Sequence, residues 1–329
     1  MPLSIFLLVL AAAALHASWN AIVKRGADKL LGTVLVTGSA ALLSAALLPL
    51  LPLPDVTSWP WLAASVLLQV VYYALVARCY QQVDMSLAYP LMRGCAPILV
   101  ALAGTVLGES LPAAAWLGVA LVSSGILAMA LGARAGQLGL PLLTATMIAT
   151  YTLVDAHGAR LSGSPLAYTL WLFLLSGIPL PLWALYTRRS AVLTYARQHW
   201  PLGLAGGVGT TASYAMALWA MTQAPVAMVS ALRESSILFA LLISAFLLRE
   251  RIPRVRWLAA SLIVSGVLAL RLAWATRARQ GWHLPPAPGR TGGQRGAFRL
   301  QRRHRLQVAL DQLDRHHHRV LAPLRGRVI

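Results

Sequence analysis

Charged residues are scarce in this chain of 329 residues. Only 11% are Asp, Glu, Lys or Arg, and nine of those are acidic, whereas 58% of the residues are hydrophobic. A soluble protein of this length needs far more charge to cover its surface, so the composition excludes an ordinary soluble domain. The two cysteines, Cys79 and Cys95, match no metal-binding or redox spacing. Each lies in or next to a hydrophobic run, so we interpret both as buried thiols.

The basic residues are distributed as in a membrane protein. The formal net charge is +19, a value also found in proteins that bind nucleic acids. However, twelve of the 28 basic residues lie in the tail from Arg277 onward, and most others lie in short loops between apolar runs. Basic residues take such positions around a bilayer. We therefore expect a lipid environment and no nucleic-acid partner.

Motifs for catalysis and cofactor binding are also missing. The chain has no phosphate-binding loop, no His-Glu-x-x-His pattern, no paired carboxylates in a span and no nucleophile with an evident base. Three adjacent histidines at 316–318 are by themselves weak evidence for a metal site. The sequence therefore predicts no enzyme activity, no metal site and no cofactor.

Hydrophobic runs long enough to cross a bilayer recur ten times. A membrane-spanning helix needs about 20 mostly apolar residues. Turn residues and charges separate the runs. The predicted spans are 3–22, 31–51, 59–78, 85–106, 112–131, 138–158, 166–186, 200–221, 226–248 and 255–275. The sequence thus predicts an all-α integral membrane protein with ten transmembrane helices.

The two halves of the chain repeat one another. A shift of 141 residues lays 59–131 over 200–272 without a gap, and 18 of the 73 aligned pairs are identical. They include Trp59 with Trp200 and Glu109 with Glu250, which apolar composition alone would not align. Because each half holds five spans, an odd number, the second copy should be turned over in the membrane. Two inverted five-helix repeats are typical of secondary transporters, whose substrate site lies near the midplane between the halves.

These observations divide the chain into three parts. Residues 1–134 form the first repeat, 135–276 the second, and 277–329 a basic tail that we expect to be disordered. Part of the tail, 297–315, alternatively fits a basic amphipathic helix on an anionic membrane surface. The first apolar run resembles a signal peptide, but residues 1–15 lack Lys and Arg and the run continues to 23. We interpret it as an uncleaved first span.

Ionisable side chains inside a span are costly and are therefore functional candidates. They are Arg93 in the fourth span, Asp155 in the sixth, and Arg233 with Glu234 in the ninth. Under the repeat shift Arg93 coincides with Glu234, and equivalent residues near a pseudo-twofold axis can touch. An ion pair there is either purely structural or, with Arg233, part of the substrate path; the sequence leaves both open.

The first span carries a polar face. His16, Asn20 and Lys24 recur every four residues, with Trp19 beside them, so we expect this face to line a cavity. His16 could carry a coupling proton, or be a packing histidine held by hydrogen bonds. Lys24 could equally be an anchor at the membrane interface.

Aromatic side chains add to the candidate site. Tyr151 shares a helix face with Asp155, and Tyr73 coincides with Tyr214 under the repeat shift. Such rings either shape a pocket for an organic solute or serve helix packing. The expected substrate-binding residues are His16, Trp19, Asn20, Tyr73, Arg93, Tyr151, Asp155, Tyr214, Arg233 and Glu234.

Several segments resemble one known family. They are the Leu-Gly-Glu-Ser-Leu-Pro loop at 107–112 before Trp116 and Gly125, its echo at 248–253, and the segments 16–24, 89–94 and 230–235. Through residue 275 the chain resembles the EamA-type branch of the drug/metabolite transporter superfamily. The resemblance implies a secondary active transporter in the bacterial inner membrane, working by alternating access on a small polar metabolite. Export and proton coupling are the modes we expect, and a homodimer is left open.

Orientation and function have alternatives. The resemblance implies that both termini are cytoplasmic, but the odd-numbered loops hold most of the basic residues outside the tail, which favours the opposite orientation. We follow the family and the basic tail. A membrane receptor or scaffold, and an intramembrane enzyme acting on lipid, are the competing functions; solute flux into liposomes would separate them from a transporter.

Overall fold

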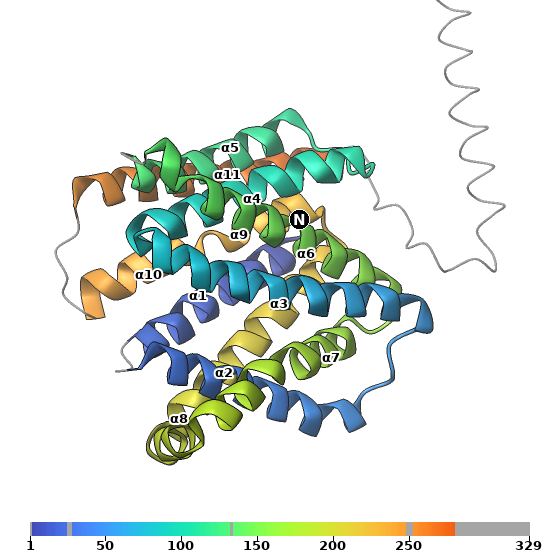
Figure 1. The fold of residues 1–329 in the computed structure, drawn as a ribbon. Coiled ribbons are helices and arrows are strands. Elements are labelled where there is room, and N and C mark those ends of the chain that lie inside the picture. Colours follow the sequence, from blue (N-terminus) through green and yellow to red (C-terminus); the bar gives the residue numbers. More distant parts are fainter. Residues whose placement is uncertain (1, 25–27, 132–133, 248–252, 280–329) are drawn as a thin grey trace, which may run out of the picture. The chain divides into compact units, whose positions relative to one another are not determined.

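The computed structural model describes residues 2–24, 28–131, 134–247 and 253–279, and these residues form helices joined by short turns (Figure 1). No β-strand occurs among them, which agrees with the predicted all-α class. The α-helices are α1 (Leu3–Lys24), α2 (Lys29–Leu47), α3 (Trp59–Gln82), α4 (Met85–Val106), α5 (Ala113–Leu127), α6 (Gly139–Leu161), α7 (Pro165–Gly177), α8 (Pro179–Gln223), α9 (Val226–Arg233), α10 (Ser236–Leu242) and α11 (Arg254–Arg279). Short 3₁₀ turns span Leu48–Leu50, Val56–Ser58, Ala128–Ala130 and Ala135–Gln137, and a π-helical turn, Ile243–Leu247, follows α10.

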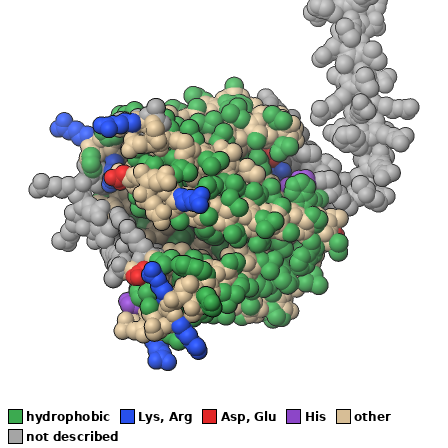
Figure 2. All heavy atoms as spheres, viewed as in Figure 1, with side chains coloured by type: hydrophobic (Ala, Val, Ile, Leu, Met, Phe, Trp, Pro, Cys, Tyr) green, Lys and Arg blue, Asp and Glu red, His purple; other side chains and the backbone are tan. Residues whose placement is uncertain are grey.

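The described helices are built for a bilayer. Within the described residues, nine segments are long and apolar enough to cross a membrane. Large apolar side chains stand exposed along them, including Leu42 at 75%, Leu67 at 68% and Leu268 at 57%. In Figure 2 hydrophobic side chains cover most of the visible face, and Lys and Arg side chains are few on it. Exposed apolar surface of this extent faces lipid rather than water, so the chain is an integral membrane protein.

The region of the predicted seventh and eighth spans differs from expectation. In place of separate helices over 166–186 and 200–221, α7 ends at Gly177 and α8 runs on to Gln223. Within α8, Arg188 and His199 leave helical geometry, with ψ angles of 41° and 15°, and Pro201 lacks the N–H that would continue the ladder. Residues 165–223 form one apolar segment of 59 residues, far longer than the roughly 20 residues that one crossing needs, and ten crossings stay a prediction.

Short polar side chains start several helices. Asp28 accepts a hydrogen bond from the backbone of Leu31 at the start of α2, and Asp84 accepts from Ser86 at the start of α4. These are N-cap contacts, which satisfy backbone donors that the first helical turn leaves free. The backbone N–H and then the hydroxyl of Ser86 lower the pKa of the exposed Asp84 carboxyl below its ordinary value.

Helices α5 and α11 pack backbone against backbone (Figure 1). A Cβ on Gly125 would lie 2.8 Å from the carbonyl oxygen of Ala259, and a Cβ on Gly266 would lie 2.8 Å from that of Gly118. A Cβ on Gly118 would in turn lie 3.0 Å from the backbone nitrogen of Leu270. Later positions on α11 contact earlier positions on α5, so the two helices are antiparallel. Glycine permits this close approach because it has no side chain.

The intramembrane charges converge from three helices. Helices α4, α6 and α9 contact one another, and they carry Arg93, Asp155 and the Arg233–Glu234 pair of neighbours. Helix α1 packs against α8, α9 and α10. The tail from 280, which includes the 297–315 segment and the three histidines, lies outside the described residues. The loop 248–252 with Glu250 and the side chain of Lys24 also lie outside them.

Candidate functional site

An interrupted helix lies at the centre of the candidate site. Helix α9 ends at Arg233 and α10 begins at Ser236, inside a single apolar stretch. The backbone N–H groups of Glu234 and Ser235 donate to carbonyls three residues earlier, each at 3.1 Å, rather than four. Interrupted membrane helices occur where their backbone is buried in protein or lines a cavity, and transporters use them to bind substrates and ions. The predicted span 226–248 corresponds to the candidate span Val226–Phe246, but the turn inside it was not predicted.

The ion pair inferred from the repeat is present. The Nε atom of Arg93 lies 2.8 Å from Oε2 of Glu234, and the two side chains are 16% and 6% exposed. Nη2 of Arg93 also donates to the hydroxyl of Ser236 at 3.3 Å. Neither Nε nor Oε2 has an aligned hydrogen-bond partner, so the contact is close but not well directed. A buried pair of this kind neutralises charge while keeping free hydrogen-bonding capacity.

Arg233 has a different environment. Its guanidinium carbon lies 5.1 Å from the ring centroid of Tyr214, which is a cation–π distance. Tyr214 itself packs edge-on against Phe173 of α7. Within the described residues, no carboxylate lies within ion-pair distance of Arg233. Because Glu234 faces Arg93, this part of the protein has one more positive than negative side chain at the helix break.

Asp155 is buried among neutral hydrogen-bond donors. Its side chain is fully buried, and Oδ2 accepts from the hydroxyl of Tyr214 at 2.5 Å and from Nε2 of Gln69 at 3.4 Å. Oδ1 accepts from the hydroxyl of Tyr168, also at 3.4 Å. The sequence identified Asp155 and Tyr214 but missed Gln69 of α3 and Tyr168 of α7. Both lie among the apolar residues of their own helices, and only the packing of α3 and α7 onto α6 brings them to the carboxylate.

Only part of the polar face of α1 lies near the charged cluster. The rings of His16 and Trp19 meet edge-on with centroids 5.4 Å apart, and Trp19 packs against Gly209 of α8. Arg93 and Arg233 both act electrostatically on His16, so this ring lies near the charged cluster. The amide of Asn20 donates to the carbonyl of His16 at 2.7 Å and is exposed. This bond lies within one helix and does not connect Asn20 to the rest of the site.

Three tyrosines form a second aromatic group. The rings of Tyr72 and Tyr151 lie 5.4 Å apart, and Tyr72 contacts Tyr73 at the same distance. Arg93 and Arg233 interact electrostatically with Tyr72 and Tyr151, which places these two rings beside the charged cluster. Tyr73 is 40% exposed and belongs to the edge of the group. Tyr72, which was outside the expected set, is nearer the charges than Tyr73.

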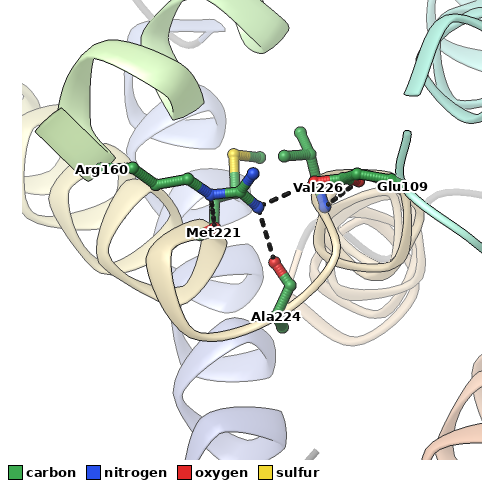
Figure 3. Close-up of polar contacts among 5 residues, drawn as sticks. All are labelled: Glu109, Arg160, Met221, Ala224 and Val226. Atoms are coloured by element: carbon green, nitrogen blue, oxygen red, sulfur yellow. Dashed lines mark hydrogen bonds and ion pairs between the residues drawn. The ribbon is translucent and has the colours of Figure 1, made fainter. Parts of the chain in front are cut away.

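A polar network at one end of the helices was not expected (Figure 3). Nη2 of Arg160 lies 2.9 Å from Oε1 of Glu109 and donates to the carbonyl of Ala224 at 3.3 Å. Nε of Arg160 donates to the carbonyl of Met221 at 3.0 Å. Glu109 also accepts from the backbone N–H of Val226, the first residue of α9, at 3.0 Å. The end of α6, the α4–α5 loop and the α8–α9 loop are thereby tied together. Glu109 stood out in the repeat, but its partners could not be read from the sequence.

Comparison with known proteins finds a family match in the second half of the chain. Residues 136–272 match the model of the EamA-like transporter family. This part of the chain is an EamA-like transporter domain. The match covers nearly all of the second predicted repeat, 135–276, including Asp155, Arg233 and Glu234. The family resemblance seen in the sequence is therefore confirmed, and its members are membrane transporters.

Solved structures share the fold. One, described only as "Crystal structure of protein", superposes with a TM-score of 0.61 at 20% sequence identity, covering 83% of this chain and 97% of its own. At this identity the likeness shows the fold alone. No curated protein matches the chain.

Proposed function

We propose that this EamA-type transporter is a secondary active exporter of a small polar metabolite that carries an anionic group. It works by alternating access in the bacterial cytoplasmic membrane, and protons drive it. The observation that carries this proposal is the charged cluster at the interrupted helix between α9 and α10. The alternatives, a receptor or scaffold and a lipid-acting enzyme, do not explain an ion pair held at such a break.

The anionic group follows from the charge at the break. Arg93 lies against Glu234, whereas Arg233 has no carboxylate neighbour among the described residues. A buried positive charge is stable only with a counter-charge or strong hydrogen bonds. A carboxylate or phosphoryl group on the substrate would supply that counter-charge, and the planar guanidinium suits both. The nearby tyrosines offer hydroxyl donors and ring faces for the rest of the molecule.

Ten spans in two inverted repeats fit the packing of α5 and α11. Gly125 is equivalent to Gly266 under the repeat shift, and Gly118 to Ala259. Gly125 contacts Ala259, and Gly266 contacts Gly118, so exchanging each residue for its equivalent in the other repeat turns one contact into the other. This is the contact pattern of a twofold axis. Because the helices are antiparallel, the axis is perpendicular to them and lies in the membrane plane, which supports the inverted arrangement.

The network around Arg160 supports alternating access. It joins three chain segments at one end of the helices, and one carbonyl near the end of α8 and one in the α8–α9 loop accept part of its bonds. Opening that end would require these bonds to break. Charge-assisted bonds at partly exposed positions are strong enough to hold a closed state and weak enough to exchange with water.

Metabolite export by living cells tests the proposal. Bacteria that lack the gene receive the wild-type chain, Arg233→Gln, or the matched control Arg78→Gln, whose side chain on α3 is exposed. We expect an anionic compound to accumulate in the medium with wild type and with the control, but not with Arg233→Gln. Flux of that compound through liposomes holding the purified chain then establishes transport.

Two results would contradict the proposal. Export of a neutral or cationic compound that Arg233→Gln leaves unchanged would rule out the anion site. If the purified chain moved no compound that differs between the cultures, a receptor or an enzyme would be the better reading.

A further inference from the structure

Asp155 is distinct among the carboxylates of the described residues. Glu109 and Glu234 lie against arginines, and Asp28, Asp55 and Asp84 accept hydrogen bonds from nearby backbone at helix starts. Asp155 is fully buried, and no cationic side chain lies within ion-pair distance of it. A buried ionised carboxylate with neutral partners alone is costly, and such groups exchange the charge for a proton.

The groups around Asp155 can serve both protonation states. When the carboxylate is ionised, Tyr214, Tyr168 and Gln69 can all donate to it, as their positions indicate. When it holds a proton, its own O–H needs an acceptor, and a tyrosine hydroxyl can turn to provide one. Rotation of a hydroxyl needs no backbone movement. The site can therefore bind and release a proton without loss of its hydrogen bonds.

The surroundings contain few other titratable groups. On α3, Ser65 and Gln69 face the carboxylate, and neither titrates. On α6 itself, Tyr151 lies one turn earlier and His157 lies two residues later, where its ring contacts Trp61 at 4.3 Å.

The remaining neighbours come from α7, α8, α9 and α4. Helices α7 and α8 contribute Tyr168 and Tyr214, and Arg233 of α9 lies over the Tyr214 ring. Arg93 of α4 and Arg233 also act on Tyr151. Within the described residues, neither arginine forms an ion pair with Asp155, and Tyr214 contacts both Asp155 and Arg233.

We propose that Asp155 is the proton-binding site of this transporter and that Tyr214 connects it to the anion site at Arg233. The inference rests on the proposed function, and it replaces His16 as the group that carries the coupling proton. Tyr214 touches both centres, with its hydroxyl on Asp155 and its ring on Arg233. When Asp155 binds a proton, the proton moves from water to a carboxylate oxygen. Release returns the proton to water. Protonation of Asp155 thereby changes the hydrogen bond of the tyrosine whose ring Arg233 contacts.

Infrared difference spectroscopy on the purified full-length chain in liposomes tests the proton site without any substrate. The chain holds only nine acidic residues, so few carboxyl bands overlap. Between mildly acidic and mildly alkaline buffer we expect a protonated-carboxyl band that appears and disappears in wild type. Asp155→Asn should abolish it, and the control Asp84→Asn, at an exposed helix cap, should retain it. Retention of the band in Asp155→Asn would overturn the proposal.

A second variant keeps the test decisive if Asp155→Asn does not fold. Tyr214→Phe removes one donor to the ionised carboxylate, so the band should persist to a pH higher by about one to two units. His16→Asn should leave the pH midpoint of the band near that of wild type. An unchanged midpoint in Tyr214→Phe, or loss of the band in His16→Asn, would overturn the assignment. Because no substrate is used, these outcomes are independent of the export experiment.

Discussion

The Arg93–Glu234 pair allows the most quantitative prediction. Removing one partner of a buried ion pair costs about 3–5 kcal/mol, because the other charge stays buried without a counter-charge. The Glu234 side chain is 6% exposed and that of Arg93 is 16% exposed. Arg93→Gln strands the more buried charge, so we expect its cost near the upper end of this range. Glu234→Gln should cost less, because Arg93 keeps its bond to Ser236.

The double variant separates the interaction energy of the two side chains from the stability that each single variant loses. Arg93→Gln with Glu234→Gln leaves two neutral amides that can hydrogen-bond to each other across the same gap. We expect the double variant to be more stable than Arg93→Gln alone, with a coupling energy of about 2–3 kcal/mol. The assay is unfolding of the detergent-solubilised full-length chain, combined with the yield of monodisperse protein. The exchange of both residues, Arg93→Glu with Glu234→Arg, places each charge at the equivalent position of the other repeat and should also fold.

A second ion pair provides the matched control. Arg160 and Glu109 lie at a similar distance, 2.9 Å, but their side chains are 23% and 19% exposed and lie at the helix ends. Solvent screens this pair more strongly, so the same four-variant cycle should give a coupling of about 1 kcal/mol or less. Equal coupling in the two cycles would show that burial does not set the strength of the central pair.

The cycle also decides between structure and transport. If the Arg93–Glu234 pair is only structural, the double Gln variant should fold and export the metabolite. If the pair takes part in binding or coupling, the variant should fold and remain inactive. Single variants as stable as wild type, or a double variant no better than Arg93→Gln, would refute the reasoning.

Three further predictions concern packing, capping and the polar network. Gly125→Ala and Gly266→Ala should each lower the free energy of unfolding by about 1–3 kcal/mol, because the new Cβ would lie 2.8 Å from a backbone oxygen. The control Gly136→Ala has open space around its Cβ and should be neutral in the same unfolding assay. Asp84→Ala should lower the unfolding temperature at neutral pH. The pKa of Asp84 is lowered in the folded protein, so its contribution is full above the ordinary carboxyl pKa and is lost as the pH falls through the folded value; a difference between variant and wild type that does not shrink in acid would contradict this. Arg160→Gln should raise the access of water-soluble thiol reagents to a cysteine placed in the α8–α9 loop, and unchanged labelling would show that the network does not hold that end closed.

Local patterns predicted most of the helices. The apolar runs and the turn residues between them placed α1 to α6 and α11 within a few residues, because these helices follow directly from hydrophobic length and capping. The break at Glu234 and Ser235 was missed. Neither residue is a proline or glycine, so the sequence carries no local signal. The interruption is maintained by tertiary contacts, including the bond from Arg93 to Ser236.

Long-range contacts were predictable only through the repeat. Arg93 and Glu234 are far apart in the chain, and their pairing followed from their equivalence under the repeat shift. Asp155 has no such relation to Gln69 or Tyr168. Their meeting depends on how α3 and α7 pack onto α6, and hydrophobic periodicity contains no information about that packing. Amide and hydroxyl side chains in apolar helices are weaker signals than charges, because a bond within their own helix often satisfies them.

The charge of the site arises where the two repeats differ. Arg93 and Glu234 occupy equivalent positions and offset each other, and Tyr73 and Tyr214 are identical. The residue equivalent to Arg233 is Met92, which is buried among apolar side chains of α3, α4 and α6. The first repeat thus places a hydrophobic side chain in a core, and the second places a cation over the ring of Tyr214. The cation at Arg233 therefore has no equivalent in the first repeat, and within the described residues no carboxylate lies within ion-pair distance of it. Under the proposed function, an anionic substrate supplies the balancing charge.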